Sequence, residues 1–302
     1  MKVLQPAIIT TAMLSASDVP ETDYTEWSAA TAYVVGNKVI KAATHRVYEC
    51  LVNNTGADPE TNLTGLTPKW MDYAPTNRWA MFDNVVGTIT SQAGTITQTL
   101  LPGPFNSIAL LGVKGDLVTI TVKDSVGGAV VYSRIISMDA TPIASLFDWF
   151  FLPYEQREDI ILTDIPYQYA TPELTVTVTA GVGNAECGVC KFGEVTLIGG
   201  TQYGATAGIT DYSIKQVDDF GNYSVVKRSF AKRATFSVQT EGSKFNHIFR
   251  TLAVLRATPC IWIGTEELNY KPLTIYRFYK DFSIDIAYPT VNMCSLEIEG
   301  LT

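Results

Sequence analysis

Residues 77–200 constrain the fold of this chain most, because they carry its densest β-type patterning. Runs such as TITV at 119–122 alternate polar and apolar residues, which places one face of a strand in a core and the other in water. Turn signals rich in glycine and proline separate the runs, for example PGP at 102–104 and GVGN at 181–184. Seven or more such runs predict an antiparallel β-sandwich.

The composition supports folded domains and limits the partners. The chain has 302 residues, 46% of them hydrophobic and 17% charged, which is enough to bury substantial cores. Its formal net charge of −8 argues against a nucleic-acid surface, because phosphate binding needs lysine and arginine gathered on one face. The densest basic run, KRSFAKR at 227–233, indicates a solvated or inter-subunit strand.

Five cysteines, an odd number spread over the whole chain, do not form a disulfide framework and are typical of a protein folded in a reducing cytosol. Cys187 and Cys190 have the spacing of a metal or redox pair, but zinc needs four ligands and the sequence offers no second pair or nearby histidine. We therefore predict a structural role for this pair, and we expect no metal and no cofactor. Cys260 and Cys294 lie in apolar runs and are predicted to be small buried hydrophobic residues.

Residues 1–20 are predicted to form an N-terminal arm or an edge strand. Their apolar part at 7–16 has some features of a secretory signal peptide, but threonines interrupt it and Pro6 precedes it. We therefore expect synthesis in the cytoplasm. No apolar run in the chain approaches the ~20 residues that a membrane-spanning helix needs.

Residues 21–76 are predicted to form a small β module. Tyr33, Val39 and Tyr48 lie in strand-forming runs, and a Gly-Asn pair at 36–37 is a tight-turn signal between two of them. Because so small a unit buries little, its aromatic residues serve either as its core or as a binding surface. The stretch at 53–68 is rich in Asn, Thr, Gly and Pro, which predicts an exposed loop.

The aromatic residues Trp27, Tyr33, Tyr48 and Trp70 follow a recognisable pattern, in which a Trp precedes Tyr-x-x-Gly-x-x-Val and a Tyr, a Pro and a closing Trp follow. In this respect the module resembles the chitin-binding modules of carbohydrate-binding families V and XII. The resemblance implies that these four rings stack on the apolar face of a sugar. The alternative from the residues alone is that the same rings form the core of the module.

One stretch breaks the β pattern of the unit at 77–200. Residues 145–154 (SLFDWFFLPY) are too apolar to lie wholly in water, so we expect them to pack onto the end of the sandwich or against a neighbouring subunit. The rhythm of the strands is similar to that of galactose-binding-type jelly rolls. That similarity implies a central jelly-roll sandwich whose loops at one end meet a ligand.

Residues 201–302 differ from the preceding units, because they combine strand-like runs with a helical pattern. Strand-like runs at 212–217 and 234–238 flank a hairpin signal at 218–222. A helix follows, with Ser243 as its N-cap and a stop at Pro259. Its apolar stripe consists of Phe245, Ile248, Phe249, Leu252 and Leu255. A helix on one face of an antiparallel sheet makes an α+β unit, so the chain is predicted to be mainly β with an α+β domain at its C-terminal end.

Segments spread over nearly the whole chain carry a second resemblance. They are the opening up to residue 24, the sugar-module motif, and the runs at 192–199, 257–264, 279–289 and 294–301. Together they resemble minor tail or tail-tip proteins of tailed bacteriophages and prophages. The resemblance implies a structural protein of the virion, at the tail tip or baseplate, that forms a homo-oligomer on the tail axis with other tail proteins and binds a host-surface glycan.

Catalysis is not expected. The two histidines, His45 and His247, lie far apart, and the sequence contains no nucleophile elbow, P-loop, HExxH or dinucleotide fingerprint. Carboxylate pairs for a glycosidase can be nominated, such as Asp116 with Asp124 or Glu155 with residues 158–159, but 30 acidic residues make such pairs frequent. The alternative to a tail protein is a secreted bacterial protein that binds or hydrolyses polysaccharide.

Overall fold

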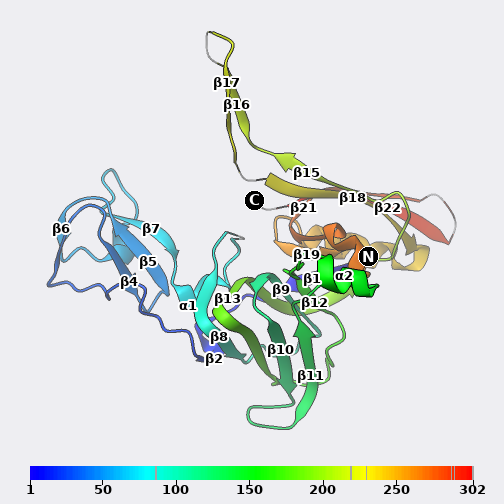
Figure 1. Ribbon diagram of the computed structural model, residues 1–302, viewed down its shortest axis with the longest axis horizontal. Coiled ribbons are helices and arrows are strands. Elements are labelled where there is room, and N and C mark those ends of the chain that lie inside the picture. The colour runs from blue at the N-terminus through cyan, green and yellow to red at the C-terminus, as the bar shows by residue number, and fades with distance from the viewer. Residues whose placement is uncertain (86, 218–219, 229, 287, 289, 301–302) are drawn as a thin grey trace.

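The computed structural model describes residues 1–85, 87–217, 220–228, 230–286, 288 and 290–300. They form a mainly β protein, 50% strand and 11% helical, as the sequence predicts. Its antiparallel sheets build a small module, a central β-sandwich and a C-terminal α+β unit (Figure 1). The predicted segments also include residues outside these ranges, namely Val86, Asp218, Asp219, Ser229, Ala287, Pro289, Leu301 and Thr302.

Strand β13 (Glu173–Leu197) is 25 residues long and belongs to both layers of the sandwich. Its first half pairs with β10 and β8. Beyond a register shift between Thr179 and Asn184, it pairs with the rest of β8, then with β9 and β1. One layer is therefore β11-β10-β13-β8-β2, and the other is β12-β9-β13-β1-β19-β20. The other bounds are β1 (Lys2–Pro6), β2 (Leu14–Ser17), β8 (Thr90–Leu100), β9 (Ser107–Lys114), β10 (Leu117–Lys123), β11 (Val130–Ser137), β12 (Ile160–Leu162), β19 (Cys260–Ile263) and β20 (Thr274–Arg277).

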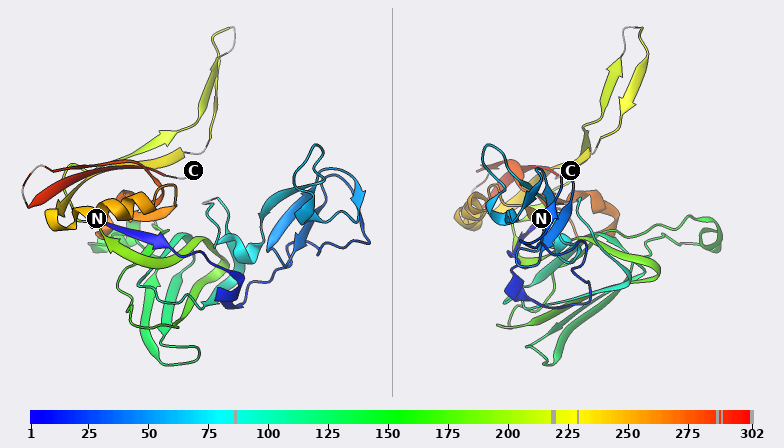
Figure 2. Two further views of the ribbon diagram at one scale, coloured as in Figure 1. Left: turned by 180° about the vertical axis from the view of Figure 1, so that it is seen from behind. Right: turned by 90° about the vertical axis from the view of Figure 1, so that its left-hand side faces the viewer.

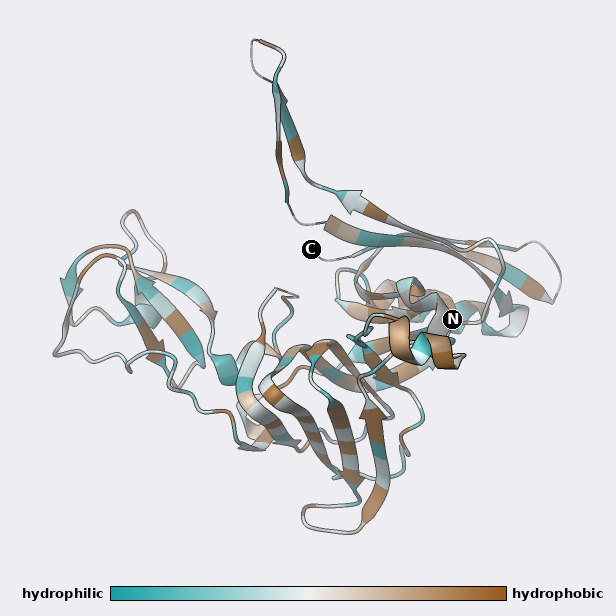
Figure 3. Ribbon diagram, viewed as in Figure 1, coloured by the Kyte–Doolittle hydropathy of each residue, from teal (hydrophilic) through white to brown (hydrophobic). Residues whose placement is uncertain are grey.

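The core between the two layers follows the alternation that the sequence predicts. Along β10, Val118, Ile120 and Val122 are buried, whereas the threonines between them are only partly buried. The opposite layer contributes residues such as Ile108 and Phe192 to the same cluster. Alternate residues of a strand face opposite sides of its sheet, so polar and apolar bands succeed one another along the strands (Figure 3).

Strand β1 lies in the interior of the second layer. It pairs with β13 on one side and with β19 on the other, so the expectation of an edge strand is wrong for these residues. Val3 is buried in the C-terminal core, and Leu4 is buried in a cluster with β9 and β19. Gly193 permits the pairing, because a Cβ there would collide with the backbone carbonyl of Gln5. The N-terminal strand thus joins the sandwich to the C-terminal unit.

The C-terminal unit is an antiparallel sheet with a helix on one face, as predicted. Its strand order is β14-β18-β22-β21, and β15 also pairs with β18. Ile248 and Leu252 of the helix pack with Phe236 of β18 and Trp262 of β19 in one buried cluster. The bounds are β14 (Gly200–Thr201), β15 (Thr206–Asp211), β18 (Phe230–Glu241), α3 (Phe245–Val254), β21 (Tyr279–Asp285) and β22 (Val291–Glu299), with 3-10 turns at Gly242–Lys244 and Leu268–Leu273.

Helix α3 differs from the prediction at its start and at one position of its stripe. A 3-10 turn precedes it and no side chain caps it, so Ser243 is not its N-cap. Ile248, Leu252 and Leu255 are buried, whereas Phe249 is 49% exposed. Phe249 stands at the rim of the sheet, where its ring meets Phe282 of the edge strand β21 at a centroid distance of 5.7 Å.

Two elements project from the body of the molecule (Figures 1 and 2). One is the arm, defined as residues 139–156, which carries helix α2 (Leu146–Phe151). Its apolar residues are exposed, so the expectation that this run packs onto the sandwich end is wrong. The other is the hairpin of β16 (Ile214–Val217) and β17 (Tyr223–Val226). The predicted strand at 234–238 belongs instead to β18, which pairs with β15 and β22.

The small module stands apart from the sandwich, beyond the short helix α1 (Figure 1). Its main sheet has the order β4-β5-β7, and β3 pairs with β6. The predicted turn at 36–37 is present: Gly36 has φ of 86°, and the Asn37 amide donates a hydrogen bond to the Val34 carbonyl at 3.0 Å. The bounds are β3 (Ala32–Tyr33), β4 (Lys38–Lys41), β5 (Arg46–Cys50), β6 (Asn54–Thr55), β7 (Trp70–Pro75) and α1 (Asn77–Ala80), with 3-10 turns at Thr11–Met13 and Pro59–Thr61.

Five free thiols and one lysine are buried. The thiols of Cys187 and Cys190 lie in the sandwich core, and burial raises the pKa of Cys190 to about 12. Next to them, Lys191 is 3% exposed and its Nζ donates a hydrogen bond to the Phe82 carbonyl at 2.6 Å. Burial lowers the pKa of Lys191 to about 8, because little water remains to solvate the ammonium group.

Replacement of Leu4 by alanine tests the joining role of β1. Truncation of a fully buried leucine costs about 2–5 kcal/mol. Because β1 is shared, we expect the sandwich and the C-terminal unit of this variant to unfold in one transition, at a lower denaturant concentration than in the wild type. The fluorescence of Trp79 and Trp262 monitors this transition. The Gln5→Ala variant, whose side chain is exposed, is the control. Two separate unfolding transitions, of which only one shifts to a lower denaturant concentration, would contradict this role.

Lys191 predicts a pH dependence of stability. Its pKa in the folded chain, about 8, lies below the ordinary value of 10.5, so the unfolded chain binds more protons between these pH values and stability rises with pH there. Relative to Lys191→Met, the free energy of unfolding of the wild type should gain up to about 3 kcal/mol across this window. Urea unfolding of both proteins measures the difference, in which tyrosine and cysteine titrations cancel. Relative to Lys114→Met, a change at an exposed lysine, the wild type should show no such gain.

Candidate functional site

Three of the four rings predicted to hold a sugar are the core of the module. Tyr33 is 6% exposed, Tyr48 is 3% exposed and Trp70 is 0% exposed. They pack with Val39 and Cys50 in one cluster, in which the rings of Tyr33 and Trp70 meet edge to face at 5.2 Å. A ring without an exposed face cannot stack on a sugar. The prediction of a stacking role is therefore wrong for these three residues, and the alternative that they form the core is confirmed.

The polar ends of the buried rings are satisfied inside the module. The indole Nε1 of Trp70 donates a hydrogen bond to the Ala57 carbonyl at 2.9 Å, and the Tyr48 hydroxyl lies 3.0 Å from the hydroxyl of Thr44. The backbone amide of Ser28 donates to the Tyr33 hydroxyl at 2.8 Å. These bonds tie the loops of the module to its sheet, because each partner lies outside a strand.

Trp27 is the predicted site residue that remains partly exposed. Its backbone is fixed beside β4, since its amide donates a hydrogen bond to the Ile40 carbonyl at 2.9 Å. Its side chain packs against the edge of the aromatic core. The ammonium group of Lys41 lies 5.4 Å from the centroid of the Trp27 ring, within the range of a cation–π contact. Of the four predicted residues, Trp27 therefore offers the aromatic surface.

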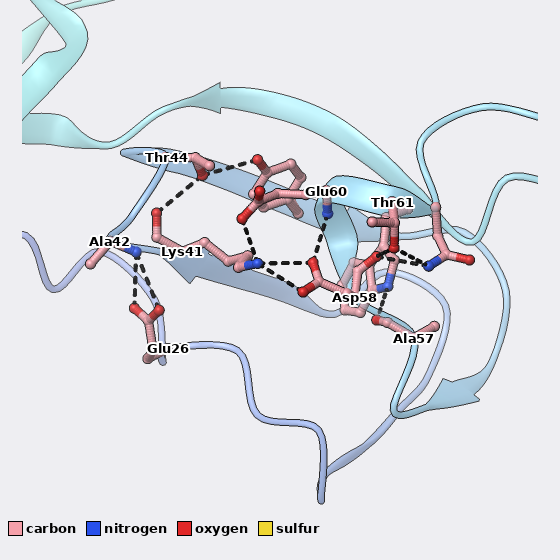
Figure 4. Close-up of polar contacts among 11 residues, drawn as sticks. Glu26, Lys41, Ala42, Thr44, Ala57, Asp58, Glu60 and Thr61 are labelled. Atoms are coloured by element: carbon pink, nitrogen blue, oxygen red, sulfur yellow. Dashed lines mark hydrogen bonds and ion pairs between the residues drawn. The ribbon is translucent and has the colours of Figure 1, made fainter. Parts of the chain in front are cut away.

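A network of charged side chains surrounds Lys41 (Figure 4). Its Nζ contacts Asp58 at 2.9 Å and Glu60 at 2.5 Å. Burial lowers the pKa of Lys41, but the hydrogen bonds to Glu60 and Asp58 outweigh it, so the pKa is raised overall. The hydrogen bond from Lys41 in turn lowers the pKa of Asp58. Glu26, next to Trp27, accepts a hydrogen bond from the Ala42 amide at 3.2 Å.

This arrangement places a partly exposed aromatic ring beside three carboxylates. We call it the Trp27 surface, formed by Trp27, Glu26, Lys41, Asp58 and Glu60. A partly exposed indole can cover the apolar face of a pyranose, and carboxylates accept hydrogen bonds from its hydroxyls. The carboxylates were not predicted from the sequence, because charged residues of an exposed loop look alike until the fold brings them to one lysine.

A second exposed aromatic cluster lies on the outer face of the sheet. Tyr73 is 49% exposed and Tyr24 is 41% exposed. The Lys38 ammonium lies 3.3 Å from the centroid of the Tyr73 ring. A hydrogen bond with the Tyr73 side chain is the largest cause that raises the pKa of Lys38. Sequence reasoning missed this face. The sequence feature that could have revealed this face is the alternation along β7, in which Met71 and Tyr73 point away from the side of Trp70.

The junction between module and sandwich is built around Glu21 and His45. The Glu21 carboxylate contacts Nδ1 of His45 at 2.9 Å and Nη1 of Arg78 at 3.5 Å, and it accepts a hydrogen bond from Thr76 at 2.7 Å. The imidazole of His45 stacks on Trp79 at a centroid distance of 4.3 Å. His45 thus has a positioning role in the fold, while His247 is exposed on α3.

Among the residues that the structure describes, no three His, Cys, Asp or Glu side chains gather in a group that could hold a metal ion. In the same ranges, no helix is long and apolar enough to cross a membrane.

Comparison of the chain with protein-family models, with curated proteins and with solved structures finds no match. The resemblances to carbohydrate-binding modules, to jelly rolls of the galactose-binding type and to tail-tip proteins therefore stay predictions.

Two tryptophan variants separate core from surface in the module. Trp70→Ala removes a fully buried ring and should cost about 3–5 kcal/mol, enough to melt the module. Trp27→Ala removes a partly exposed ring and should cost clearly less, with the module still folded. Hydrogen exchange of the β4, β5 and β7 amides in both variants measures the difference. Equal loss of protection would place Trp27 in the core as well.

Proposed function

We propose that this chain is a structural protein of a bacteriophage tail tip or baseplate, which assembles with copies of itself and with other tail proteins. The observation that carries the proposal is the apolar surface on the arm and the hairpin. Trp149 is 68% exposed and Phe150 is 73% exposed. A single copy leaves such side chains in water, whereas an assembly covers them. The sequence resemblance to tail-tip proteins points in the same direction.

The nominated pair of Asp116 and Asp124 does not have the geometry of a glycosidase. Asp116 and Asp124 flank the seven-residue strand β10 at opposite ends, which separates them by about 26 Å, whereas a glycosidase pair is about 5–9.5 Å apart. Each also shapes a turn: Asp116 accepts a hydrogen bond from the Gly181 amide at 2.6 Å, and Asp124 accepts one from the Ala129 amide at 3.1 Å. Their roles are structural.

The position of β1 also weighs against the secreted alternative. Cleavage after Ala16, as in a signal peptide, would remove the strand between β13 and β19 together with most of β2. Both the sandwich and the C-terminal core would then lose buried residues such as Val3 and Leu4. The pairing of β1 with β13 and β19 therefore argues against cleavage at this position.

The module adds a second, weaker role in this proposal, the binding of a host-surface glycan at the Trp27 surface. One copy of the chain should bind the glycan weakly, with a Kd on the order of millimolar, because one partly exposed ring and a few hydroxyl contacts contribute little. Several copies on one particle raise the avidity without any new contact. The module stands apart from the sandwich (Figure 1), a position in which a surface ligand can reach it.

The test of the proposal is the place of the chain in a particle. Tailed particles from the cell that encodes the chain should contain it in their tail fraction, and cryo-electron microscopy should locate several copies around the tail axis. Deletion of its gene should yield particles without a complete tail tip. A glycan array with these particles should lose its signal in the Trp27→Ala variant and keep it in a Val35→Ala control.

Two results would contradict this function. One is a chain found free in the medium and absent from every tail fraction. The other is turnover of a polysaccharide by the purified chain that a single carboxylate substitution abolishes.

A further inference from the structure

Helix α2 is apolar on nearly all sides. Of its six residues, LFDWFF, only Asp148 is polar, and the five others are 68–80% exposed. A helix that is hydrophobic all round is normally buried in protein or membrane. None of the four hydrophobic clusters of the described residues includes a residue of α2. The helix therefore has the surface of a buried element and no cover in its own chain.

The arm holds this helix in one place. At its base the Ala140 amide bonds to the Glu155 carbonyl at 2.8 Å and the Arg157 amide to the Met138 carbonyl at 2.7 Å, with Met138 fully buried. At its tip Ser145 caps the helix through the Asp148 amide. A contact element that is already ordered loses less conformational entropy on binding.

The hairpin is the second element without cover. All eight residues of β16 and β17 are exposed, and on both faces some are apolar: Ile214 and Val226 share one face, and Val217, Tyr223 and Val225 share the other. Within the described residues these strands pair only with each other. A two-stranded hairpin alone is marginally stable in water, so an extended apolar hairpin indicates a partner.

The two elements complement each other in charge. Residues 139–156 contain Asp139, Asp148 and Glu155 and no lysine or arginine. Residues 212–228, which include the hairpin, contain three basic residues, Lys215, Lys227 and Arg228, and two aspartates at 218–219, so their formal charge is +1. The acidic arm disfavours an anionic lipid surface, which attracts lysine and arginine. The charges therefore favour a second copy of this chain as the partner.

Size and direction also fit this partner. Helix α2 is about 9 Å long, from six residues at 1.5 Å each, and each hairpin strand is about 13 Å long. The arm and the hairpin leave the body in different directions (Figure 2), so they do not cover each other within one chain. Contact between two different surfaces is heterologous, and it generates a ring where the rotation closes.

We infer that the arm of one copy docks its α2 helix on the β16–β17 hairpin of the next copy, and that this contact, repeated head to tail, forms the ring of the assembly. The inference rests on the proposed function only in its last step, the ring on a tail axis. The docking itself concerns the purified chain.

The test uses two variants of the full chain that each spoil one surface. Trp149→Glu with Phe150→Glu places charge on the arm, and Val225→Glu with Val226→Glu places charge on both faces of the hairpin. All four side chains are exposed, so folding should be unchanged, which melting curves check. Val182→Glu, at a fully exposed position outside both elements, is the matched control.

Light scattering should show self-association of the wild type and of the control. Each double variant alone should dissociate, with its dissociation constant raised at least roughly 30-fold, as for the loss of a buried aromatic anchor. Mixed together, they should form a dimer and stop there, because the mixture contains one intact arm and one intact hairpin per pair. Affinity should also fall as salt rises.

Other outcomes overturn the inference in distinct ways. A monomeric wild type excludes the contact. Co-sedimentation of the wild type, but not of the arm variant, with phosphatidylglycerol vesicles assigns α2 to a membrane. Association of the hairpin variant alone indicates an arm-to-arm contact. By contrast, a dimer in the mixture together with absence of the chain from tail fractions would support the docking contact and reject only the proposed function.

Discussion

The backbone pairing of β13 is the interaction on which the rest of the structure depends. This one strand contributes hydrogen bonds to β10, β8, β9 and β1, and through its bend it is a member of both layers of the sandwich. Both of its faces are buried from Cys187 to Gly193, whereas residues 174–180 alternate between buried and partly buried, with threonines at the partly buried positions. Loss of its pairing at any point would leave backbone groups of two neighbours without partners.

Strand β1 extends this dependence to the C-terminal unit. Its two edges pair with β13 and β19, which lie far apart in sequence, and its two faces contribute to two different cores. The boundary between sandwich and C-terminal unit is thus a shared sheet, since β19 and β20 complete the second layer. Such an interface resists relative motion of the two units, in contrast to the junction of the module, which depends on a few side chains around Glu21.

Exposed aromatic surface is distributed unevenly over the molecule. In the module the large rings were used to build a core, because a unit of that size has few other residues to bury. In the arm and the hairpin, by contrast, large apolar residues face water where the sandwich core is already complete. The same residue types therefore carry stability in one part and contact surface in another.

The sequence by itself determined the mainly β fold, the alternation along β10, the helix at the C-terminal unit and the burial of the cysteines. These features depend on local periodicity and on residue size, which a single sequence displays. Only the tertiary structure decided which aromatic residues are covered. Trp70 and Phe150 look alike in sequence, but other strands of the module cover the first, whereas no described strand covers the second. The interior place of β1 was likewise decided by partners some 190 and 260 residues away, because long-range pairing leaves no mark in the local pattern of a strand.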